Sequence, residues 1–191
     1  MGTLPIEVVK SYTQLITRPI DGYSFHIQFT ENSLVYDARN YLAQYAIDND
    51  LDYVLWVDSD VIFPADGLER LLAHDKDFVT GVYFQRRPPH YPTIYSHVGE
   101  DGKEVCTDYT KKRLFQVEGC GFGFCLVKVD VMRKMVNEYG YLFHPIPQLG
   151  EDLSFCYRWT QMGGEIWCDP TIKLGHLGTQ VYGEEDYHGE R

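Results

Sequence analysis

The sequence predicts an α/β protein of a single domain, in which helices flank a mostly parallel central sheet. Strand-like and helix-like segments alternate through the first half of the chain, which is the pattern of a parallel sheet covered by helices. One of these segments, YVLWV at 53–57, is apolar throughout, as expected for a strand that is buried on both faces. The length of 191 residues suits one sizeable core better than two.

The first half is expected to contain helices at 5–17 and 33–49 and strands at 22–29, 53–57 and 78–84. Pro64 would open a short helix between the last two strands, and Asn32 or Ser33 would cap the second helix. The residues expected to face the core are Ile6, Val9, Leu15 and Ile16 in the first helix, Leu34, Ala38, Leu42, Tyr45 and Ala46 in the second, and Leu68, Leu71 and Leu72 in the short one.

The second half begins with an insertion at about 85–113 that is rich in Pro, Tyr and charged residues and contains an EDGK turn at 100–103. We interpret it as a loop with a small antiparallel hairpin. Two strands around a glycine-rich bend are expected at 114–129, followed by a helix at 130–139 capped by Asp130. A further helix over 151–162 ends at two glycines, a last strand covers 165–169, and the tail shows no clear period.

Composition narrows the classes of function. The chain carries 17 basic and 28 acidic residues, a net charge of −11, which argues against a general grip on nucleic-acid backbones but allows a local basic groove. Five cysteines form no C-x-x-C pair, so disulfides and zinc are not expected, and a reducing cytoplasm is the simpler location. No segment has the length of a membrane span, and no signal peptide opens the chain.

Two carboxylates follow the apolar strand, in the sequence LWVDSDVIF. Asp58 and Asp60 are separated by one residue, so on an extended backbone both would project to the same side. Ligands of open α/β sheets bind beyond the carboxyl ends of the strands, and two neighbouring carboxylates repel unless a cation or a proton lies between them. The alternative is an Asx-turn or helix cap that leads into Pro64.

A second acidic pair, Glu151 and Asp152, stands at the expected start of a helix, where stabilisation of the helix dipole is the alternative explanation. A carboxylate beside other carboxylates can have its pKa raised into the range of a general base. His176 lies between glycines in KLGHLG and could add an imidazole to oxygen ligands, a set that suits Mn²⁺ or a similar cation.

Four motifs in this order, VLWVDSDVIF, GCGFGFCLVKVDVM, GEDLSFCYRWTQMGGEIWCD and KLGHLG, resemble glycosyltransferases of the GT-A (Rossmann-like) fold. YDARNYLAQYAI at 36–47 is similar to the same group, the family-2-like enzymes of bacteria and their viruses. The resemblance covers roughly residues 20–180. It implies an enzyme that uses a divalent metal, Mn²⁺ or Mg²⁺, to hold a nucleotide-diphospho-sugar, a UDP-sugar being the expected donor.

The resemblance also implies roles for individual residues. Asp60 would be the direct metal ligand, His176 would ligate the metal or reach the diphosphate, and Asp58 would contact the ribose or a metal-bound water, so these three form the expected metal site. Asp152 would be the base that deprotonates the acceptor hydroxyl, with Glu151 positioning substrate, and the reaction would invert configuration. Further donor-binding residues would be Arg39, Ser59 and the strand around Gly121, Phe122 and Gly123. Those glycines would line the sugar pocket or only form a bulge.

Two features depart from the family pattern. The apolar strand that usually begins such enzymes is not found: either the chain begins late, its start is mis-assigned, or another segment fills the gap. The 85–113 insertion holds the only basic concentration, which is either a solvated loop or an acceptor lid or phosphate contact. Its members are Arg86, Arg87, His90, Lys111, Lys112 and Arg113.

The leading hypothesis is therefore a metal-dependent glycosyltransferase. Its acceptor would be a glycan, a lipid-linked sugar, a protein or a hydroxymethylated DNA base, and the sequence does not indicate an oligomeric state. A nucleotidyltransferase is an alternative, but the glycine-rich, basic phosphate loop that such enzymes need near their start is not found. A non-catalytic relative that binds a nucleotide-sugar or carbohydrate is the second alternative; the missing first strand favours it and Glu151-Asp152 disfavours it.

Overall fold

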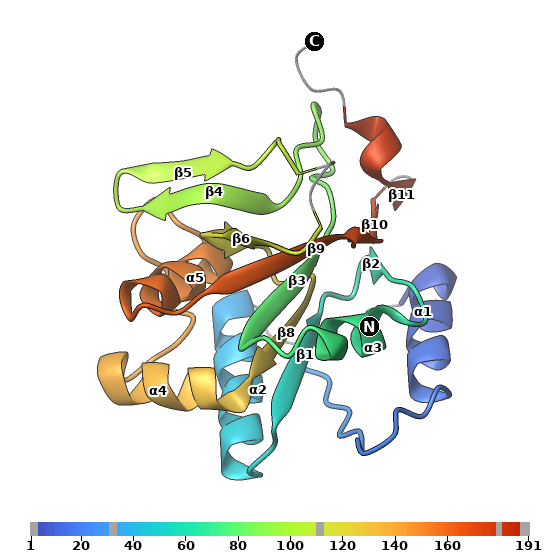
Figure 1. The fold of residues 1–191 in the computed structure, drawn as a ribbon, viewed down its shortest axis with the longest axis horizontal. Coiled ribbons are helices and arrows are strands. Elements are labelled where there is room, and N and C mark those ends of the chain that lie inside the picture. Colours follow the sequence, from blue (N-terminus) through green and yellow to red (C-terminus); the bar gives the residue numbers. More distant parts are fainter. Residues whose placement is uncertain (1–3, 31–33, 110–112, 179–180, 188–191) are drawn as a thin grey trace.

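The computed structural model describes residues 4–30, 34–109, 113–178 and 181–187. Its centre is a five-stranded mixed sheet flanked by helices (Figure 1). In spatial order the strands are β1 (Tyr53–Val57), β8 (Phe124–Lys128), β3 (Phe78–Val82), β9 (Ile166–Lys173) and β6 (Phe115–Val117). The predicted α/β class is confirmed.

The sheet is mixed, which corrects the expectation of a mostly parallel one. β1, β3 and β9 run in one direction, but β8 lies antiparallel between β1 and β3, and β6 is antiparallel to β9. Only β3 and β9 are parallel neighbours. Alternation of helix and strand along the chain gives no information on a strand that returns from later in the sequence and inserts between two earlier ones.

Helices cover both faces of this sheet. Figure 1 shows α2 (Val35–Asp48), α4 (Val129–Tyr139) and α5 (Glu151–Gln161) on one side and α1 (Ile6–Ile16) and α3 (Gly67–Ala73) on the other. Each side has its own core: Trp56, Phe122 and Phe155 belong to the first, and Val79, Phe124 and Leu126 to the second. Successive side chains of β8 point into these two cores in turn. The end of the glycine-rich segment 119–123, which leads into β8, is therefore fixed by packing on both faces of the sheet.

The insertion forms the predicted hairpin, with β4 (Ile94–Gly99) and β5 (Gly102–Val105) joined at the EDGK turn. β4 also pairs with β7 (Gly119–Cys120), so the segment 114–129 contains three short strands rather than two. Tyr95 and Val98 of the hairpin pack on Leu149 and Leu153 beside the start of α5. The hairpin is therefore fixed against the helix that carries the second acidic pair.

The described part of the tail forms short regular elements, although its sequence shows no clear period. β9 runs four residues beyond the predicted end at 169, to Lys173. The chain then forms β10 (Gly175–Leu177), β11 (Val181–Tyr182) and a 3₁₀ turn at Glu184–Asp186. β10 pairs with β2 (Val61–Ile62), which places His176 opposite Val61. Strands of two or three residues are too short to produce a visible period, so sequence patterning does not reveal them.

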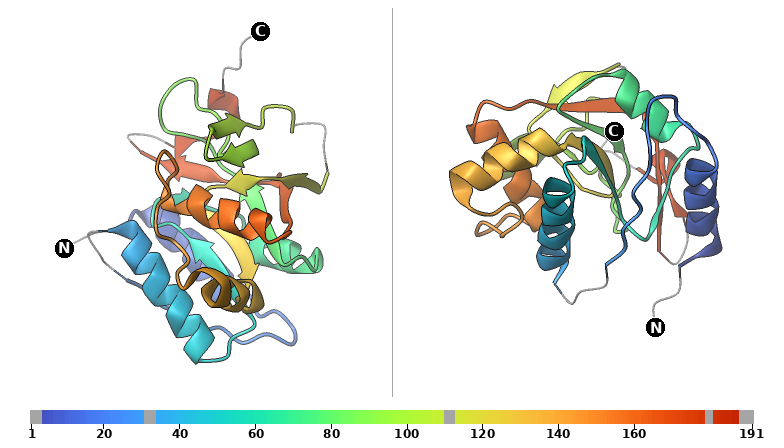
Figure 2. Two further views of the ribbon diagram at one scale, coloured as in Figure 1. Left: turned by 90° about the vertical axis from the view of Figure 1, so that its left-hand side faces the viewer. Right: turned by 90° about the horizontal axis from the view of Figure 1, so that it is seen from below.

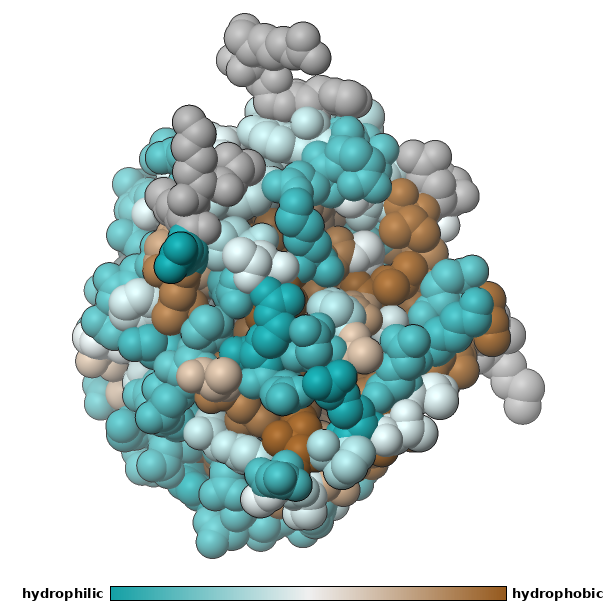
Figure 3. Space-filling model, turned by 45° about the vertical axis from the view of Figure 1, so that its right-hand side comes forward, coloured by the Kyte–Doolittle hydropathy of each residue, from teal (hydrophilic) through white to brown (hydrophobic). Residues whose placement is uncertain are grey.

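The N-terminal region departs most from expectation. The segment 22–29 forms no strand, and α1 buries Val8, Ser11 and Leu15 while Ile6 remains 60% exposed. In α2 the buried residues are Arg39, Ala43 and Ala46. Of the predicted stripe, Ala46 is buried, the residues Ala38, Leu42 and Tyr45 are half-buried, and Leu34 is exposed. Figure 3 shows hydrophobic patches among the hydrophilic side chains of the face that includes α1. The predicted caps Asn32 and Ser33 lie outside the described residues.

β1 lies at the edge of the sheet and pairs only with β8 among the described strands. Only Trp56 of its five residues is buried, so the expectation of a strand covered on both faces is wrong. The segment 22–30 passes along this side of the molecule (Figure 2), and together with α1, α2 and β1 it lines a slot of about 530 Å³. The slot reaches Arg39, Asp58 and Ser59 at one end.

Smaller points complete the description. α4 begins one residue before Asp130, which lies in the first turn rather than at the cap. All five cysteines are buried, and none of them forms a disulfide within the described residues. No helix in the described ranges is long and apolar enough to cross a membrane.

Candidate functional site

The first acidic pair stands on a tight turn directly after β1. The backbone N–H of Asp58 donates to Gly123 O at 3.1 Å, and that of Val61 donates to Asp58 O at 3.2 Å. Because the chain turns here, the two carboxylates take different partners: Asp58 meets Arg39 and Asp60 meets Arg86. The extended backbone on which the expectation for these two side chains rested is therefore not present.

Arg39 connects the two acidic pairs. It lies in α2 with its side chain 8% exposed, and its two terminal nitrogens donate to Asp58 Oδ1 at 3.0 Å and to Glu151 Oε1 at 2.9 Å. Burial acts to lower the pKa of Arg39, but the charges of Asp58 and Glu151 outweigh it and raise that pKa. The guanidinium also lies over the Phe122 ring, 5.2 Å from its centroid. Arg39 is thus a buried bridge that holds the D-x-D turn against the start of α5.

The second acidic pair occupies the first turn of α5, as predicted. Asp152 Oδ1 accepts the backbone N–H of Leu153 at 2.7 Å. Burial, followed by the charge of Glu151, raises the pKa of Asp152 from 3.8 to about 6, with Arg39 opposing the shift. A carboxyl group with this pKa is ionised at neutral pH and can still take up a proton readily.

His176 reaches the first acidic pair from the tail. Its Nδ1 donates to Phe84 O, with 2.7 Å between the two atoms, and its Nε2 lies 3.5 Å from Asp60 Oδ2. Burial acts to raise the pKa of Asp60, but the hydrogen bond and charge of His176, together with the charge of Arg86, lower it. A histidine whose Nδ1–H is fixed by a backbone carbonyl presents Nε2 as a ligand atom.

The expected metal site is assembled in part. In the described ranges, no group of three or more His, Cys, Asp or Glu residues is arranged to hold a metal ion. Asp60 and His176 offer one oxygen and one oriented nitrogen, a set that suits Mn²⁺, whereas the Asp58 carboxylate is bound to Arg39. Two of the three predicted ligands therefore fit a divalent cation, and a ligand molecule or water would have to supply the remaining positions.

The glycine-rich segment makes room for a tyrosine. A Cβ on Gly121 would collide with the Tyr83 hydroxyl, and one on Gly123 would lie 2.8 Å from the same ring. Gly123 N–H donates to the Tyr83 hydroxyl at 3.3 Å, and burial, followed by the charges of Asp58 and Asp152, raises the pKa of Tyr83. Tyr83 therefore lies within electrostatic reach of both acidic pairs.

Phe122, expected among the donor-binding residues, is a core residue. Its side chain is 1% exposed and its ring contacts Trp56, Phe78 and Phe155. It cannot offer a face to a sugar ring, so that expectation is corrected. Ser59, by contrast, is exposed on the turn beside Asp58 and lines the slot.

The basic concentration of the insertion is dispersed in the structure. Arg86 forms an ion pair with Asp60, with 3.0 Å between its NH1 atom and Asp60 Oδ2, while the buried His90 donates its Nδ1–H to Gln85 O at 2.8 Å. Lys111 and Lys112 lie outside the described residues. No local signal connects Arg86 with Asp60, because 26 residues separate them and the contact arises only from the fold.

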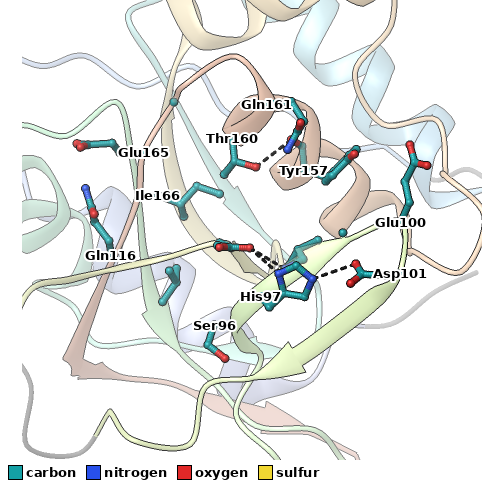
Figure 4. Close-up of a pocket in the computed structure, with 15 residues that line it drawn as sticks. Ser96, His97, Glu100, Asp101, Gln116, Tyr157, Thr160, Gln161, Glu165 and Ile166 are labelled. Atoms are coloured by element: carbon teal, nitrogen blue, oxygen red, sulfur yellow. Dashed lines mark hydrogen bonds and ion pairs between the residues drawn. The ribbon is translucent and has the colours of Figure 1, made fainter.

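A second, more open cavity of about 950 Å³ lies between the β4–β5 hairpin and the last turns of α5 (Figure 4). His97 projects into it, with Nε2 3.0 Å from Asp101 and Nδ1 3.1 Å from Glu118. None of the predicted site residues lines this cavity. The candidate site is therefore the end of the first slot, where Arg39 joins the acidic pairs.

Comparisons with known proteins bear on the fold of the chain. The Anp1 family model matches residues 21–94, less than half of the chain. A sequence search of curated proteins finds no match. Among solved structures, A197 from STIV superimposes with a TM-score of 0.62 at 18% identity, over 93% of this chain and 82% of that one.

GalNAc-T7, solved with UDP, GalNAc and Mn²⁺, matches with a TM-score of 0.51 at 14% identity, over 83% of this chain. This chain spans about a third of the length of that one, since the match covers 32% of it. Identities this low establish the fold only. The chain has the GT-A type of glycosyltransferase fold.

Proposed function

We propose that this protein is a glycosyltransferase that moves a sugar from a nucleotide-diphospho-sugar, a UDP-sugar in the first instance, to an acceptor hydroxyl. The observation that carries the proposal is the Arg39 bridge, which joins the turn of Asp58 to the helix start of Glu151 and Asp152. Arg39 thereby brings the two carboxylate pairs, whose surroundings differ, to one site. The GT-A type of fold and the Anp1 match support this class of activity.

The donor end of the site would lie at the slot. Asp58 and Ser59 stand where the apolar slot of about 530 Å³ meets the polar turn, an arrangement that suits a nucleoside with its ribose at the polar end. Asp60 and His176 would hold Mn²⁺ or Mg²⁺ beside the diphosphate. When bound, such an ion neutralises charge that develops on the leaving diphosphate.

Asp152 would act as the general base. Its pKa of about 6 leaves it ionised at neutral pH, so it can accept the proton of the acceptor hydroxyl while the hydroxyl oxygen attacks the anomeric carbon. The bond between that carbon and the diphosphate oxygen breaks, and the electron pair remains on the leaving diphosphate. A single base and direct attack give inversion of configuration. Glu151 would orient Asp152 and the substrate through Arg39.

The acceptor would approach along the hairpin. Burial, followed by the charge of Asp152, raises the pKa of Tyr95 in β4 to about 12, and Lys103 of β5 acts to lower the pKa of Asp152. Both observations support a site in which the β4–β5 hairpin lies beside Asp152, the proposed base. A glycan, a lipid-linked sugar, a protein or a hydroxymethylated DNA base remain the acceptor classes to test.

The test is a panel of nucleotide-sugars with Mn²⁺ or Mg²⁺, read by release of nucleoside diphosphate and by thermal stabilisation. We expect at least one UDP-sugar to raise the melting temperature in a metal-dependent way and to be hydrolysed or transferred slowly. Stabilisation without any release across all acceptor classes would indicate a binding relative without catalysis. No stabilisation by any donor would contradict the proposal.

A further inference from the structure

Arg86 stands beside the expected metal ligands although it comes from the start of the insertion. Its NH1 atom lies 3.0 Å from Asp60 Oδ2 and donates to Leu177 O at 3.1 Å. Asp60 Oδ2 is also the atom that lies 3.5 Å from His176 Nε2. A guanidinium group thus shares the carboxylate oxygen that a metal ion would need.

The local backbone accommodates this arginine. A Cβ on Gly178 would lie 3.0 Å from Arg86 Cδ, so a larger residue there would press on the arginine stem. Leu177 is held at the same time, because its N–H donates to Asp60 O at 2.7 Å. Arg86 therefore lies in a corner formed by the D-x-D turn and the end of β10, where backbone and side-chain acceptors converge.

The charges around the site make Arg86 the arginine available to a ligand. The terminal nitrogens of Arg39 donate to Asp58 and Glu151, and its side chain is 8% exposed. The Arg86 side chain is 48% exposed and holds Asp60 from the solvent side. A diphosphate that enters between several carboxylates needs cationic partners, and a guanidinium group matches phosphate oxygens with two parallel donors.

We propose that Arg86 binds the diphosphate of the donor and that, in the free protein, it competes with the divalent metal for Asp60. The inference rests on the proposed function. Arg86 pairs with Asp60 while the site is empty, and it turns to the phosphate oxygens when a metal and a donor arrive. Arg86 belongs to the insertion at 85–113, and it contributes a part of the donor affinity that does not depend on metal.

Two opposite effects follow from this competition. Removing the Arg86 charge takes a cation from the diphosphate, so UDP binds more weakly, by about tenfold or more for a lost charge-assisted hydrogen bond. The same change frees Asp60, so Mn²⁺ alone binds more tightly, by a few-fold. A residue that only stabilised the fold would shift both affinities in the same direction.

The experiment compares wild type, Arg86→Gln, Arg86→Lys and the neighbouring, exposed Arg87→Gln by calorimetric titration. UDP is titrated in EDTA and in saturating Mn²⁺, and Mn²⁺ is titrated without nucleotide. We expect Arg86→Gln to weaken UDP binding and strengthen Mn²⁺ binding, Arg86→Lys to be intermediate, and Arg87→Gln to match wild type. Circular dichroism confirms that each variant is folded.

The outcomes separate this inference from the function on which it rests. If wild type binds UDP but Arg86→Gln binds both UDP and Mn²⁺ like Arg87→Gln, the role of Arg86 is refuted and the proposed function stands. Weaker binding of both ligands by Arg86→Gln would also refute the competition. If wild type binds no UDP in either condition, both proposals fail.

Discussion

Asp60 and Asp152 are the same residue type in one site, yet their environments act in opposite directions. Asp60 has His176 and Arg86 as neighbours, and its pKa is lowered despite partial burial. Asp152 has Glu151 beside it and is desolvated, and its pKa is raised to about 6. Neighbouring carboxyl groups whose pKa values are driven apart are suited to different roles. The lowered pKa suits Asp60 to the proposed role of a charged ligand for a cation, and the raised pKa suits Asp152 to the proposed exchange of a proton.

The largest expected effect is loss of turnover in Asp152→Asn. Without a proton acceptor, the rate of sugar transfer should fall by about 10²–10⁴-fold, while UDP-sugar binding stays the same or tightens because a negative charge is removed. Nucleoside diphosphate release and calorimetry measure the two quantities. Asp130→Asn, an acid in the first turn of α4, is the matched control. Full turnover in Asp152→Asn would break the assignment of the base.

The next effect concerns Asp60. In Asp60→Asn the oxygen shared by His176 and Arg86 loses its charge, so we expect Mn²⁺-dependent UDP binding to weaken by at least about tenfold, or 1.4 kcal/mol. Asp77→Asn, exposed directly before β3 and outside the residues that line the slot, should leave it unchanged. Equal metal dependence in the two variants would remove the distinction between Asp60 and other surface carboxylates.

Stability should respond with opposite signs to the same substitution at the two positions. A raised folded-state pKa gives stability that is present below the unfolded value of 3.8 and is lost as pH rises through about 6. Asp152→Asn should therefore melt a few degrees above wild type at pH 8, corresponding to at most about 3 kcal/mol, and close to wild type at pH 4.

The lowered pKa of Asp60 gives the reverse. Its stability contribution is present above the unfolded value and is lost as pH falls, so Asp60→Asn should melt below wild type at pH 8, with the difference shrinking in acid. Differential scanning calorimetry at both pH values measures all three proteins. If both substitutions change the melting temperature in the same direction at pH 8, the opposite pKa shifts of Asp60 and Asp152 do not determine their contributions to stability.

The smallest expected effect tests how much Glu151 contributes to the raised pKa of Asp152. Glu151→Gln removes the charge that, after burial, raises the pKa of Asp152 most, while the amide oxygen can still accept from Arg39. The acidic limb of the pH–rate profile should move to lower pH by less than about one unit. If the limb remains in place, burial alone accounts for the raised pKa.

The sequence predicts most helices and strands but not how they pair. Leu68 and Leu71 are buried as their spacing indicates, and the D-x-D turn and the acidic helix start lie where the motifs put them. The helix α1 is predicted, but its buried face is predicted only in part. Apolar residues occur on more than one side of this helix, so their spacing does not select a face: Leu15 is buried as expected, whereas Val8 is buried and Ile6 is not. The segment 22–29 alternates like a strand, but a strand requires a partner edge, and none forms there.

The contacts that bring the site residues together could not be predicted from local sequence patterns either. Arg39 could be selected by resemblance, but its bridge to Glu151 spans 112 residues. The pairs of Arg86 and His176 with Asp60 depend on β10 meeting β2. The contact of the Tyr83 ring with Gly121 and Gly123 likewise joins distant parts of the sequence. Such contacts are fixed by tertiary packing, so only a three-dimensional structure reveals them.

The pairing of β10 with β2 bears on when this protein matures during its synthesis. Both aspartates of the turn leave the ribosome more than a hundred residues before His176 does, and domains fold as units while the chain emerges. A nascent chain that still lacks β10 carries Asp60 without its imidazole neighbour. The site proposed for the metal is therefore complete only after β10 has been synthesised and has paired with β2.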